Sequence, residues 1–167
     1  DCRIPKTALM GKLNDGFRTA VGELAGGRIG IGSLGLGIGQ AAIEYATKYA
    51  MNRFQFDQPI TNFQAIQWMI AESYTELEAA RLLLMNAAFK KENGKFFARE
   101  ASMAKYYATE AAERACHKAI QMLGGYGYTN EFPVERYARD VRITSIYEGT
   151  NQVQRLIIAK DILSGLK

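Results

Sequence analysis

The segment IYEGTNQVQR at residues 146–155 holds one carboxylate in a setting suited to proton transfer. Glu148 follows an isoleucine and a tyrosine, and it precedes Gly149, where the missing side chain lets a ligand approach the backbone. A carboxylate held against apolar groups is poorly solvated, which makes it a better proton acceptor. A simpler interpretation is a helix N-terminus, with Thr150 as the N-cap and Glu148 as a solvated loop acid. Spacing alone favours this simpler interpretation.

Helices must position this segment, and the first is unusual because it is rich in glycine. Apolar residues at helical spacing predict a helix from Gly16 to about Arg53, although the segment contains eight internal glycines between residues 22 and 39. Each glycine costs about 1 kcal/mol relative to alanine inside a helix. Either this segment is a flexible loop, or it is a helix buried where its neighbours approach the backbone closely. The helical spacing favours the helix.

The remaining elements are also expected to be helical. We expect four further helices. They cover about 60–92, the alanine-rich stretch that ends near Leu123, a short stretch at 133–140, and a last stretch that begins after Thr150 and ends at about Leu163. Asn93-Gly94 and Gly124-Gly125 mark two of the breaks. Alanines repeat every three or four residues between 101 and 119, which permits close helix packing. The last helix is expected to bury Val153, Leu156, Ile157 and Leu163. Four long helices with short breaks and almost no strand pattern predict an all-α, antiparallel four-helix bundle.

Three blocks of sequence resemble a known family. Residues 147–155, YEGTNQVQR, are similar to the C-terminal signature of the acyl-CoA dehydrogenases, FAD enzymes that oxidise an acyl-CoA thioester to the 2-enoyl-CoA. Residues 121–140 and 53–67 resemble two further conserved blocks, and all three occur in family order over nearly the whole chain. The detail is closest to the short-chain, butyryl-CoA-type members. The resemblance implies that residues 1–12 are the tail of a preceding β-domain and residues 13–167 the C-terminal helical domain.

The resemblance also implies catalytic roles. Glu148 matches the glutamate that removes the α-proton of the thioester, and its own backbone N–H would help to hold the thioester carbonyl. Gly149 would lie against the acyl chain or the thioester. Some relatives place the base on the long helix instead, at the position of Gly27, where no carboxylate is available here. Arg28 matches the family's active-site arginine, whereas on spacing alone it would be a surface cation.

Cofactor contacts are implied on two different subunits. An arginine offers a planar fork suited to a pyrophosphate, and a glycine lets the adenosine part of a dinucleotide approach the backbone. Contacts to the FAD of a neighbouring subunit are implied for Arg53, Phe56, Gln64, Gln121 and Gly125, and contacts to the subunit's own FAD for Thr150 and Gln152. Asp57 stands where the family usually has glycine, so we expect the turn after Phe56 to differ.

Composition sets broad limits on the function. The chain has 167 residues, is 48% hydrophobic and carries a formal net charge of +4, which fits an ordinary domain that binds phosphate-bearing ligands such as CoA and FAD. No nucleic-acid motif accompanies the charge, and no apolar run reaches the roughly 18 residues of a membrane span. Cys2 and Cys116 form no disulfide framework, and the latter is expected to be a small buried thiol. His117 has no plausible ligand set, so no metal site is expected.

The family resemblance implies partners and a location. These are an acyl-CoA substrate, an electron-transfer flavoprotein as acceptor, and a homo-oligomer built as a dimer of dimers. The location would be the cytoplasm in a bacterium and the mitochondrial matrix in a eukaryote. The chain begins at Asp1 instead of a start methionine, and we expect it to be a fragment.

Two other functions remain open from the sequence. One is an acyl-CoA oxidase of the same fold, which would differ in the access of oxygen to the flavin. The other is a non-catalytic helical oligomerisation module. It would explain the alanine stripe and the glycine-rich helix without needing Glu148, Arg53 or Gln121.

Overall fold

Helices dominate the part of the chain that the structure describes. The computed structural model describes residues 1–166. Its α-helices are α1 (Gly16–Asn52), α2 (Gln64–Glu92), α3 (Ala98–Leu123), α4 (Val134–Arg142) and α5 (Asn151–Gly165). A hairpin of β1 (Phe54–Gln55) and β2 (Gln58–Pro59) joins α1 to α2, and 3-10 turns lie at Lys6–Ala8, Ile60–Asn62, Gly124–Tyr128 and Ile143–Ser145. The all-α fold predicted from the sequence is confirmed.

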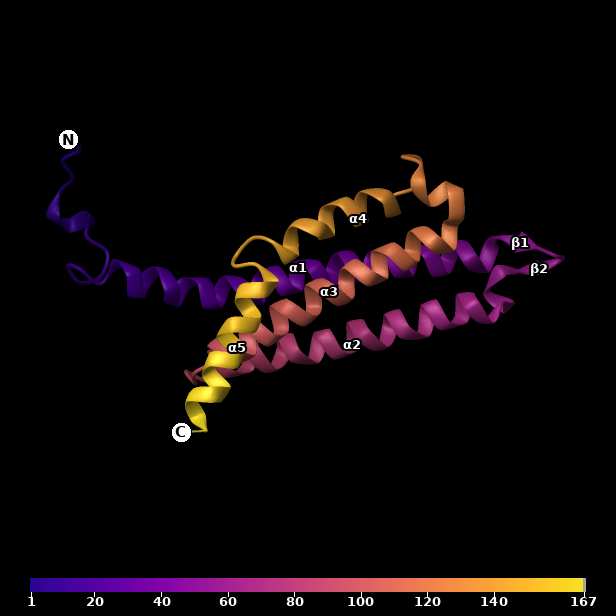
Figure 1. Cartoon of the computed structure of the whole chain (residues 1–167). Coiled ribbons are helices and arrows are strands. Elements are labelled where there is room, and N and C mark those ends of the chain that lie inside the picture. The colour runs from indigo at the N-terminus through magenta and orange to yellow at the C-terminus, as the bar shows by residue number, and fades with distance from the viewer. Residues whose placement is uncertain (167) are drawn as a thin grey trace.

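The first four helices alternate in direction and form the bundle (Figure 1). Helices α1 and α3 run the same way, α2 and α4 run the opposite way, and α4 packs on both α1 and α3. Helix α5 crosses α3 near the N-terminal end of α3 and continues beyond the bundle (Figure 1). The antiparallel bundle is therefore as predicted, but its fourth member is the short helix α4.

Helix α3 is the centre of the bundle because small residues cover the faces it turns toward its neighbours. All six alanines of the predicted stripe are fully buried: Ala101, Ala104, Ala108, Ala111, Ala115 and Ala119. Helix α3 packs against α1, α2, α4 and α5. Cys116 is also buried on this helix, and burial, with a smaller contribution from Glu113, raises the pKa of its thiol to about 12. The expectation of a buried thiol is confirmed.

The glycines of α1 allow α1 and α3 to approach each other closely. Gly32, Gly35 and Gly39 face the core, and a Cβ placed on Gly39 would lie 2.8 Å from the Cα of Ala112. Some larger apolar residues of the same helix, such as Leu34, are exposed, whereas Ile43 is fully buried. The segment is therefore a buried helix with close neighbours and not a flexible loop. Its stability comes from this packing, since its intrinsic helix propensity is low.

The breaks between helices use left-handed residues. Gly94 and Gly124 have φ values of 64° and 60° and end α2 and α3, as the sequence predicts. Phe56 and Asp57 both have positive φ, 52° and 59°, which makes the β1–β2 connection a two-residue turn of type I′. Aspartate tolerates this conformation better than most residues, so the turn forms without the glycine usual in the family.

Helix α5 buries different residues from those expected. Val153, Leu156 and Leu163 are exposed, and Ile157 is only partly buried. The buried positions are Asn151 and Gln154, because the first turn of α5 lies on a polar part of α3 and the later turns extend past the bundle (Figure 1). The expectation of an apolar buried face on α5 is therefore wrong for this chain.

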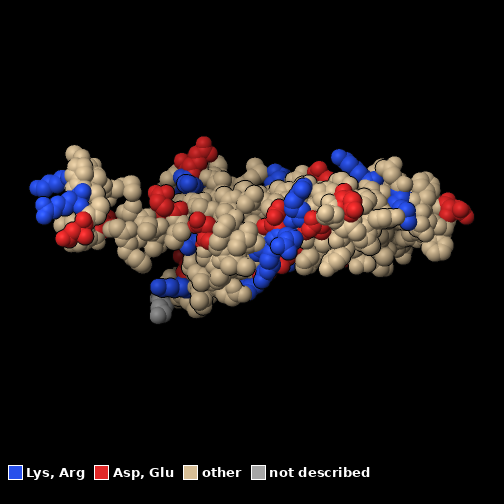
Figure 2. Space-filling model, turned by 90° about the horizontal axis from the view of Figure 1, so that it is seen from above, with Lys and Arg blue, Asp and Glu red and all other residues tan. Residues whose placement is uncertain are grey.

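Much of the described surface is apolar. Figure 2 shows one face on which uncharged surface predominates, with a band of charged residues across the middle and others toward both ends. Large exposed apolar side chains occur at both ends of the bundle, among them Phe17, Phe56, Trp68, Phe89 and Leu156. Within residues 1–166, no helix combines the length and the apolar content that crossing a membrane requires.

The N-terminal segment lies away from the bundle (Figure 1). Residues 1–12 are exposed throughout and contain one 3-10 turn, Lys6–Ala8. Their assignment to the tail of a β-domain stays a prediction, and so does the boundary between residues 12 and 13.

Candidate active site

The loop before α5 turns through two left-handed residues. Glu148 has φ 55° and Gly149 has φ 88°. A non-glycine residue in this region costs about 1–3 kcal/mol and persists only where its surroundings hold it. A Cβ on Gly149 would lie 2.6 Å from Nε2 of Gln154, so a side chain at 149 would displace the glutamine. The turn therefore fixes where the carboxylate points.

The Glu148 carboxylate lies against the bare backbone of α1 at Gly27. A Cβ on Gly27 would be 2.8 Å from Oε2 of Glu148, so glycine is the residue that leaves room for the acid. Oε2 is buried and has no hydrogen-bond partner among the described residues. A carboxylate oxygen without a donor keeps its full capacity to accept a proton. The solvated loop acid of the simpler interpretation is thus not what the chain forms, although Thr150 does cap α5.

Arg28 is buried beside this carboxylate, with 7% of its surface exposed. Its Nη1 is 3.5 Å from Oγ of Ser102, and its Nε has no partner among residues 1–166. Burial lowers the pKa of Arg28 below its ordinary value, and the charge of Glu148 opposes that shift. The unpaired N–H of Arg28 and the unpaired oxygen of Glu148 offer a polar ligand one donor and one acceptor. Arg28 is not the surface cation that spacing alone suggests.

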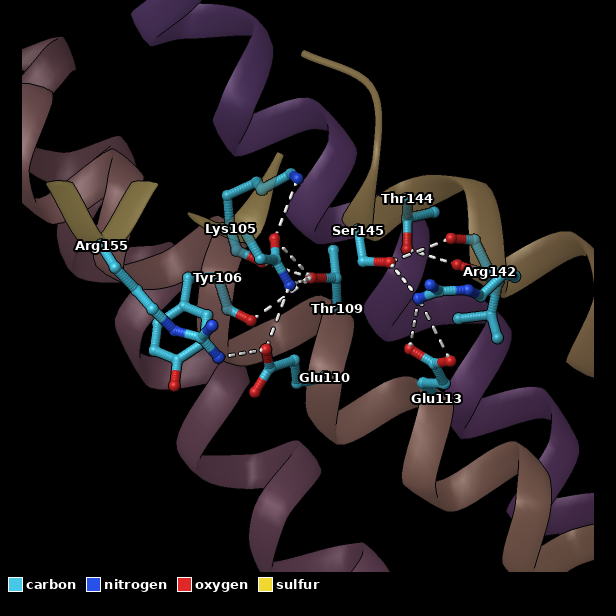
Figure 3. Close-up of polar contacts among 11 residues, drawn as sticks. Lys105, Tyr106, Thr109, Glu110, Glu113, Arg142, Thr144, Ser145 and Arg155 are labelled. Carbon is cyan, nitrogen blue, oxygen red and sulfur yellow. Dashed lines mark hydrogen bonds and ion pairs between the residues drawn. The ribbon is translucent and has the colours of Figure 1, made fainter. Parts of the chain in front are cut away.

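A polar cluster missed by the sequence analysis lies behind the turn. Lys105 of α3 is fully buried, and its Nζ donates to the carbonyl of Gly149 at 3.0 Å and to Oδ1 of Asn151 at 3.0 Å. Nε2 of Gln154 donates to the same carbonyl of Gly149 at 2.9 Å. Figure 3 shows Lys105 near Thr109, whose Oγ1 accepts from Nδ2 of Asn151 at 3.0 Å. These contacts join α3, the turn and α5.

Charge balance at this cluster depends on Lys105. The pKa of Lys105 falls from 10.5 to about 8. Burial is the main cause of this fall, the Arg28 guanidinium adds to it, and the Glu148 carboxylate opposes it. The side chain is still mostly protonated at neutral pH. Two buried cations therefore flank one carboxylate. A signal for Lys105 was present in the sequence, since it occurs four residues after Ala101 and four before Thr109, on the small-residue face of α3.

Three predicted cofactor residues come together at the other end of the bundle. Arg53, Gln121 and Gly125 line one groove of about 510 Å³ at the C-terminal ends of α1 and α3. The Arg53 guanidinium lies 5.6 Å from the centre of the Tyr126 ring. The groove therefore offers a guanidinium, an aromatic ring and an accessible backbone glycine.

Phe56 and Gln64 lie outside this groove. Phe56 is 85% exposed at the tip of the β1–β2 hairpin, and its ring meets the edge of Phe63 at 6.1 Å between ring centres. Gln64 is exposed at the first position of α2. The structure brings neither residue into contact with Arg53, so their predicted role depends on a ligand or partner that reaches the hairpin.

Thr150 and Gln152 lie at the start of α5, next to Glu148. Oγ1 of Thr150 accepts from the N–H of Val153 at 3.4 Å, and the Gln152 side chain is exposed. Both residues line a small cavity of about 100 Å³ together with Arg142 and Ser145. The predicted cofactor residues thus fall into two groups. Helix α1 separates Gly27, beside the Glu148 carboxylate, from Arg53 by about 40 Å at 1.5 Å per residue, whereas the small cavity and the groove lie closer together, since Glu113 of α3 lines the first and Gln121 of α3 the second.

The fold and the site define a class of protein: an all-α domain in which a carboxylate with one buried, unpaired oxygen lies beside a buried arginine, at the opposite end from an open groove. Within residues 1–166, no three His, Cys, Asp or Glu side chains gather closely enough to hold a metal ion. The chain belongs to the acyl-CoA dehydrogenase family, since residues 14–163 match the model of the acyl-CoA dehydrogenase C-terminal domain. Members of this family are FAD-dependent oxidoreductases.

Individual relatives agree with this assignment. The chain is 53% identical to the short-chain specific acyl-CoA dehydrogenase, mitochondrial, of Rattus norvegicus over 98% of its length, and 48% identical to the caffeyl-CoA reductase-Etf complex subunit CarC of Acetobacterium woodii over 98% of its length. The structure of butyryl-CoA dehydrogenase from Megasphaera elsdenii matches 96% of the chain with a TM-score of 0.94 and 42% identity. The chain spans 40%, 43% and 42% of these three proteins.

Proposed function

We propose that this chain is the C-terminal helical domain of an FAD-dependent acyl-CoA dehydrogenase, in which Glu148 removes the α-proton of a short-chain acyl-CoA. The observation that carries the proposal is the buried, unpaired Oε2 of Glu148 against the bare Cα of Gly27. A general base needs an oxygen that is free to accept a proton and fixed in place, and the left-handed turn provides the fixed position.

Glu148 and Arg28 have different roles in the removal of the proton. Glu148 accepts the proton from Cα of the thioester, and negative charge develops on the thioester oxygen. Arg28 stays charged beside the carboxylate once that carboxylate is neutralised, so the local field then favours the negative charge on the substrate. The backbone of Gly149 would lie against the acyl chain or the thioester. FAD, which Thr150 and Gln152 would help to hold, would supply the acceptor for the hydride that leaves Cβ.

The two groups of cofactor residues fit FAD molecules bound at two separate places. In this proposal Thr150 and Gln152 contact the FAD used by the same chain's Glu148. The groove of Arg53, Gln121 and Gly125 takes the adenosine and pyrophosphate part of a second chain's FAD, with Phe56 and Gln64 extending that contact. The support is that Glu148, beside Gly27, lies about 40 Å along α1 from Arg53, so that the flavin serving this base is not the cofactor of the groove. The active protein is then a homo-oligomer, as a dimer of dimers would be.

Replacing Arg53 with alanine should weaken the retention of FAD by the full-length protein, because the groove loses its only guanidinium among the lining residues described here. The measurement is the ratio of FAD to protein after gel filtration at a series of salt concentrations. Arg114→Ala is a matched control, since Arg114 is an exposed arginine paired with Glu76. Equal FAD content in both variants would contradict the shared site.

The acyl-CoA substrate and an electron-transfer flavoprotein as redox partner belong to the same proposal. The A. woodii relative supports this partner, because its name places it in a complex with Etf. That relative is also named a reductase, so the reverse reaction, reduction of an enoyl-CoA, is a second candidate at the same site. The location would follow the source: the mitochondrial matrix for a eukaryote, as for the rat relative, and the cytoplasm for a bacterium.

One experiment separates these functions. The full-length protein with FAD is mixed with butyryl-CoA while the flavin absorbance is followed, and the reduced protein is then offered oxygen or an electron-transfer flavoprotein. Rapid bleaching and reoxidation by the flavoprotein support the dehydrogenase. Reoxidation mainly by oxygen indicates an oxidase, faster turnover of crotonyl-CoA with reduced flavoprotein indicates a reductase, and a protein that binds no flavin indicates an oligomerisation module.

A further inference from the structure

The left-handed turn at Glu148 and Gly149 is held by side chains that do not face the proposed substrate. The carbonyl of Gly149 accepts two hydrogen bonds, from Nζ of Lys105 at 3.0 Å and from Nε2 of Gln154 at 2.9 Å. Gln154 also reaches the carbonyl of Glu148 at 3.4 Å. Both donors are completely buried. Every one of these bonds acts on the backbone of the turn and leaves the Glu148 carboxylate free.

Lys105 is itself anchored on both sides. It is part of α3, the central helix, and its second bond goes to Oδ1 of Asn151, the first residue of α5. Nδ2 of Asn151 donates to Thr109, one turn further along α3. The ammonium therefore joins the turn to the central helix of the bundle, whereas Gln154 joins it only to α5.

Burying the charged side chain of a lysine at this position costs free energy. Lysine is almost never fully buried unless its charge is paired or hydrogen-bonded, and an apolar side chain of similar size is often at least as stable. Burial first, and the charge of Arg28 second, lower the pKa of Lys105. The presence of Lys105 at a buried position is explained by a role that an apolar residue could not fill.

We infer that Lys105 is a positioning residue: through the carbonyl of Gly149 it holds the left-handed turn that directs the Glu148 carboxylate at Gly27. That Lys105 holds the turn is inferred from its hydrogen bonds alone. The kinetic consequence rests on the proposed function, because it concerns the removal of the α-proton by Glu148. A base displaced by about 1 Å loses on the order of 10²-fold in rate.

Lys105→Met tests this inference. Methionine fills a similar volume without donors or charge, and each acceptor keeps one partner: Gln154 for the Gly149 carbonyl and Oγ1 of Thr109, at 3.3 Å, for Oδ1 of Asn151. The variant should therefore fold. Lys118→Met is the matched control on the same helix, where Lys118 pairs with Glu72 near the surface.

The first measurement is the crystal structure of the Lys105→Met variant. We expect φ of residue 148 to leave the positive region and the carboxylate to withdraw from Gly27. The second is the rate of flavin bleaching by butyryl-CoA in the full-length protein, where we expect a loss of about 10²-fold in kcat with KM unchanged. Lys118→Met should change neither result.

An unchanged turn in Lys105→Met overturns the inference, whatever the rates are. A displaced turn with kcat equal to that of Lys118→Met overturns the catalytic consequence. If Lys105→Met does not fold, Gln154→Leu is the second test, because it leaves Lys105 as the main support of the turn. The turn should then stay in place, and a lost turn would assign the role to Gln154. A wild-type protein without dehydrogenase activity would reject the proposed function, while the crystal structures would still decide the role of Lys105.

Discussion

Glu148→Gln is expected to lower the rate of α-proton abstraction by about 10²–10⁴-fold in the full-length protein. The amide has nearly the same shape as the carboxylate and should occupy the same place against Gly27, so FAD and acyl-CoA should still bind. It cannot accept the proton, because the amide nitrogen is a donor and the amide oxygen is a far weaker base. The loss should appear in the chemical step and not in KM.

Two measurements check this result. Flavin bleaching after rapid mixing with butyryl-CoA reports the whole oxidation, and exchange of the substrate α-hydrogens with deuterated water reports proton abstraction alone. Glu76→Gln is a suitable control, since Glu76 pairs with Arg114 at the surface of the bundle. A Glu148→Gln variant that bleaches at the rate of this control would remove Glu148 from the mechanism.

Gly39→Ala is expected to destabilise the protein by about 1–3 kcal/mol, although alanine is the better helix former. The new Cβ would lie 2.8 Å from Cα and 2.9 Å from Cβ of Ala112 on α3. Neither atom belongs to a flexible side chain, so α1 and α3 would have to separate. The close packing that compensates the low helix propensity of α1 would then be lost.

Gly37→Ala on the same helix provides the opposite result. Gly37 is exposed, and a Cβ there would meet nothing within 4 Å, so the substitution should stabilise the helix by up to about 1 kcal/mol. Urea unfolding of the two variants beside the wild type measures both changes. If Gly39→Ala were as stable as Gly37→Ala, the contact between α1 and α3 would be looser than the structure indicates.

Local sequence was sufficient to predict the helices, because their ends carry their own signals. Gly94 and Gly124 end α2 and α3 by adopting the left-handed conformation, and Thr150 caps α5. The alanine stripe of α3 also predicted close helix packing, and all six of its alanines are fully buried. The inward face of α1 was harder to predict, since the residues that it buries most closely, such as Gly39, have no side chain to produce a hydrophobic pattern.

The candidate site could be predicted only in part. Resemblance to a family identified Glu148 and Arg28, and the structure places them together. Lys105 and Gln154 were missed because a lysine or a glutamine on a helix is normally solvated. Their burial is decided by partners 44 and 5 residues away in sequence, whose positions depend on the packing of α3 against the turn. Hydrophobic periodicity cannot reveal a core that is made of polar residues. For that reason the sequence predicted the wrong buried face of α5.

The length of α1 has a genetic consequence. On the proposed shared site, a chain contributes its base to one active centre and its Arg53 to another, about 40 Å away along the same helix. Two defective alleles, one altered at Glu148 and one at Arg53, would then complement each other. In a mixed dimer one centre would carry both defects and the other neither, so about a quarter of all centres would regain activity at equal expression.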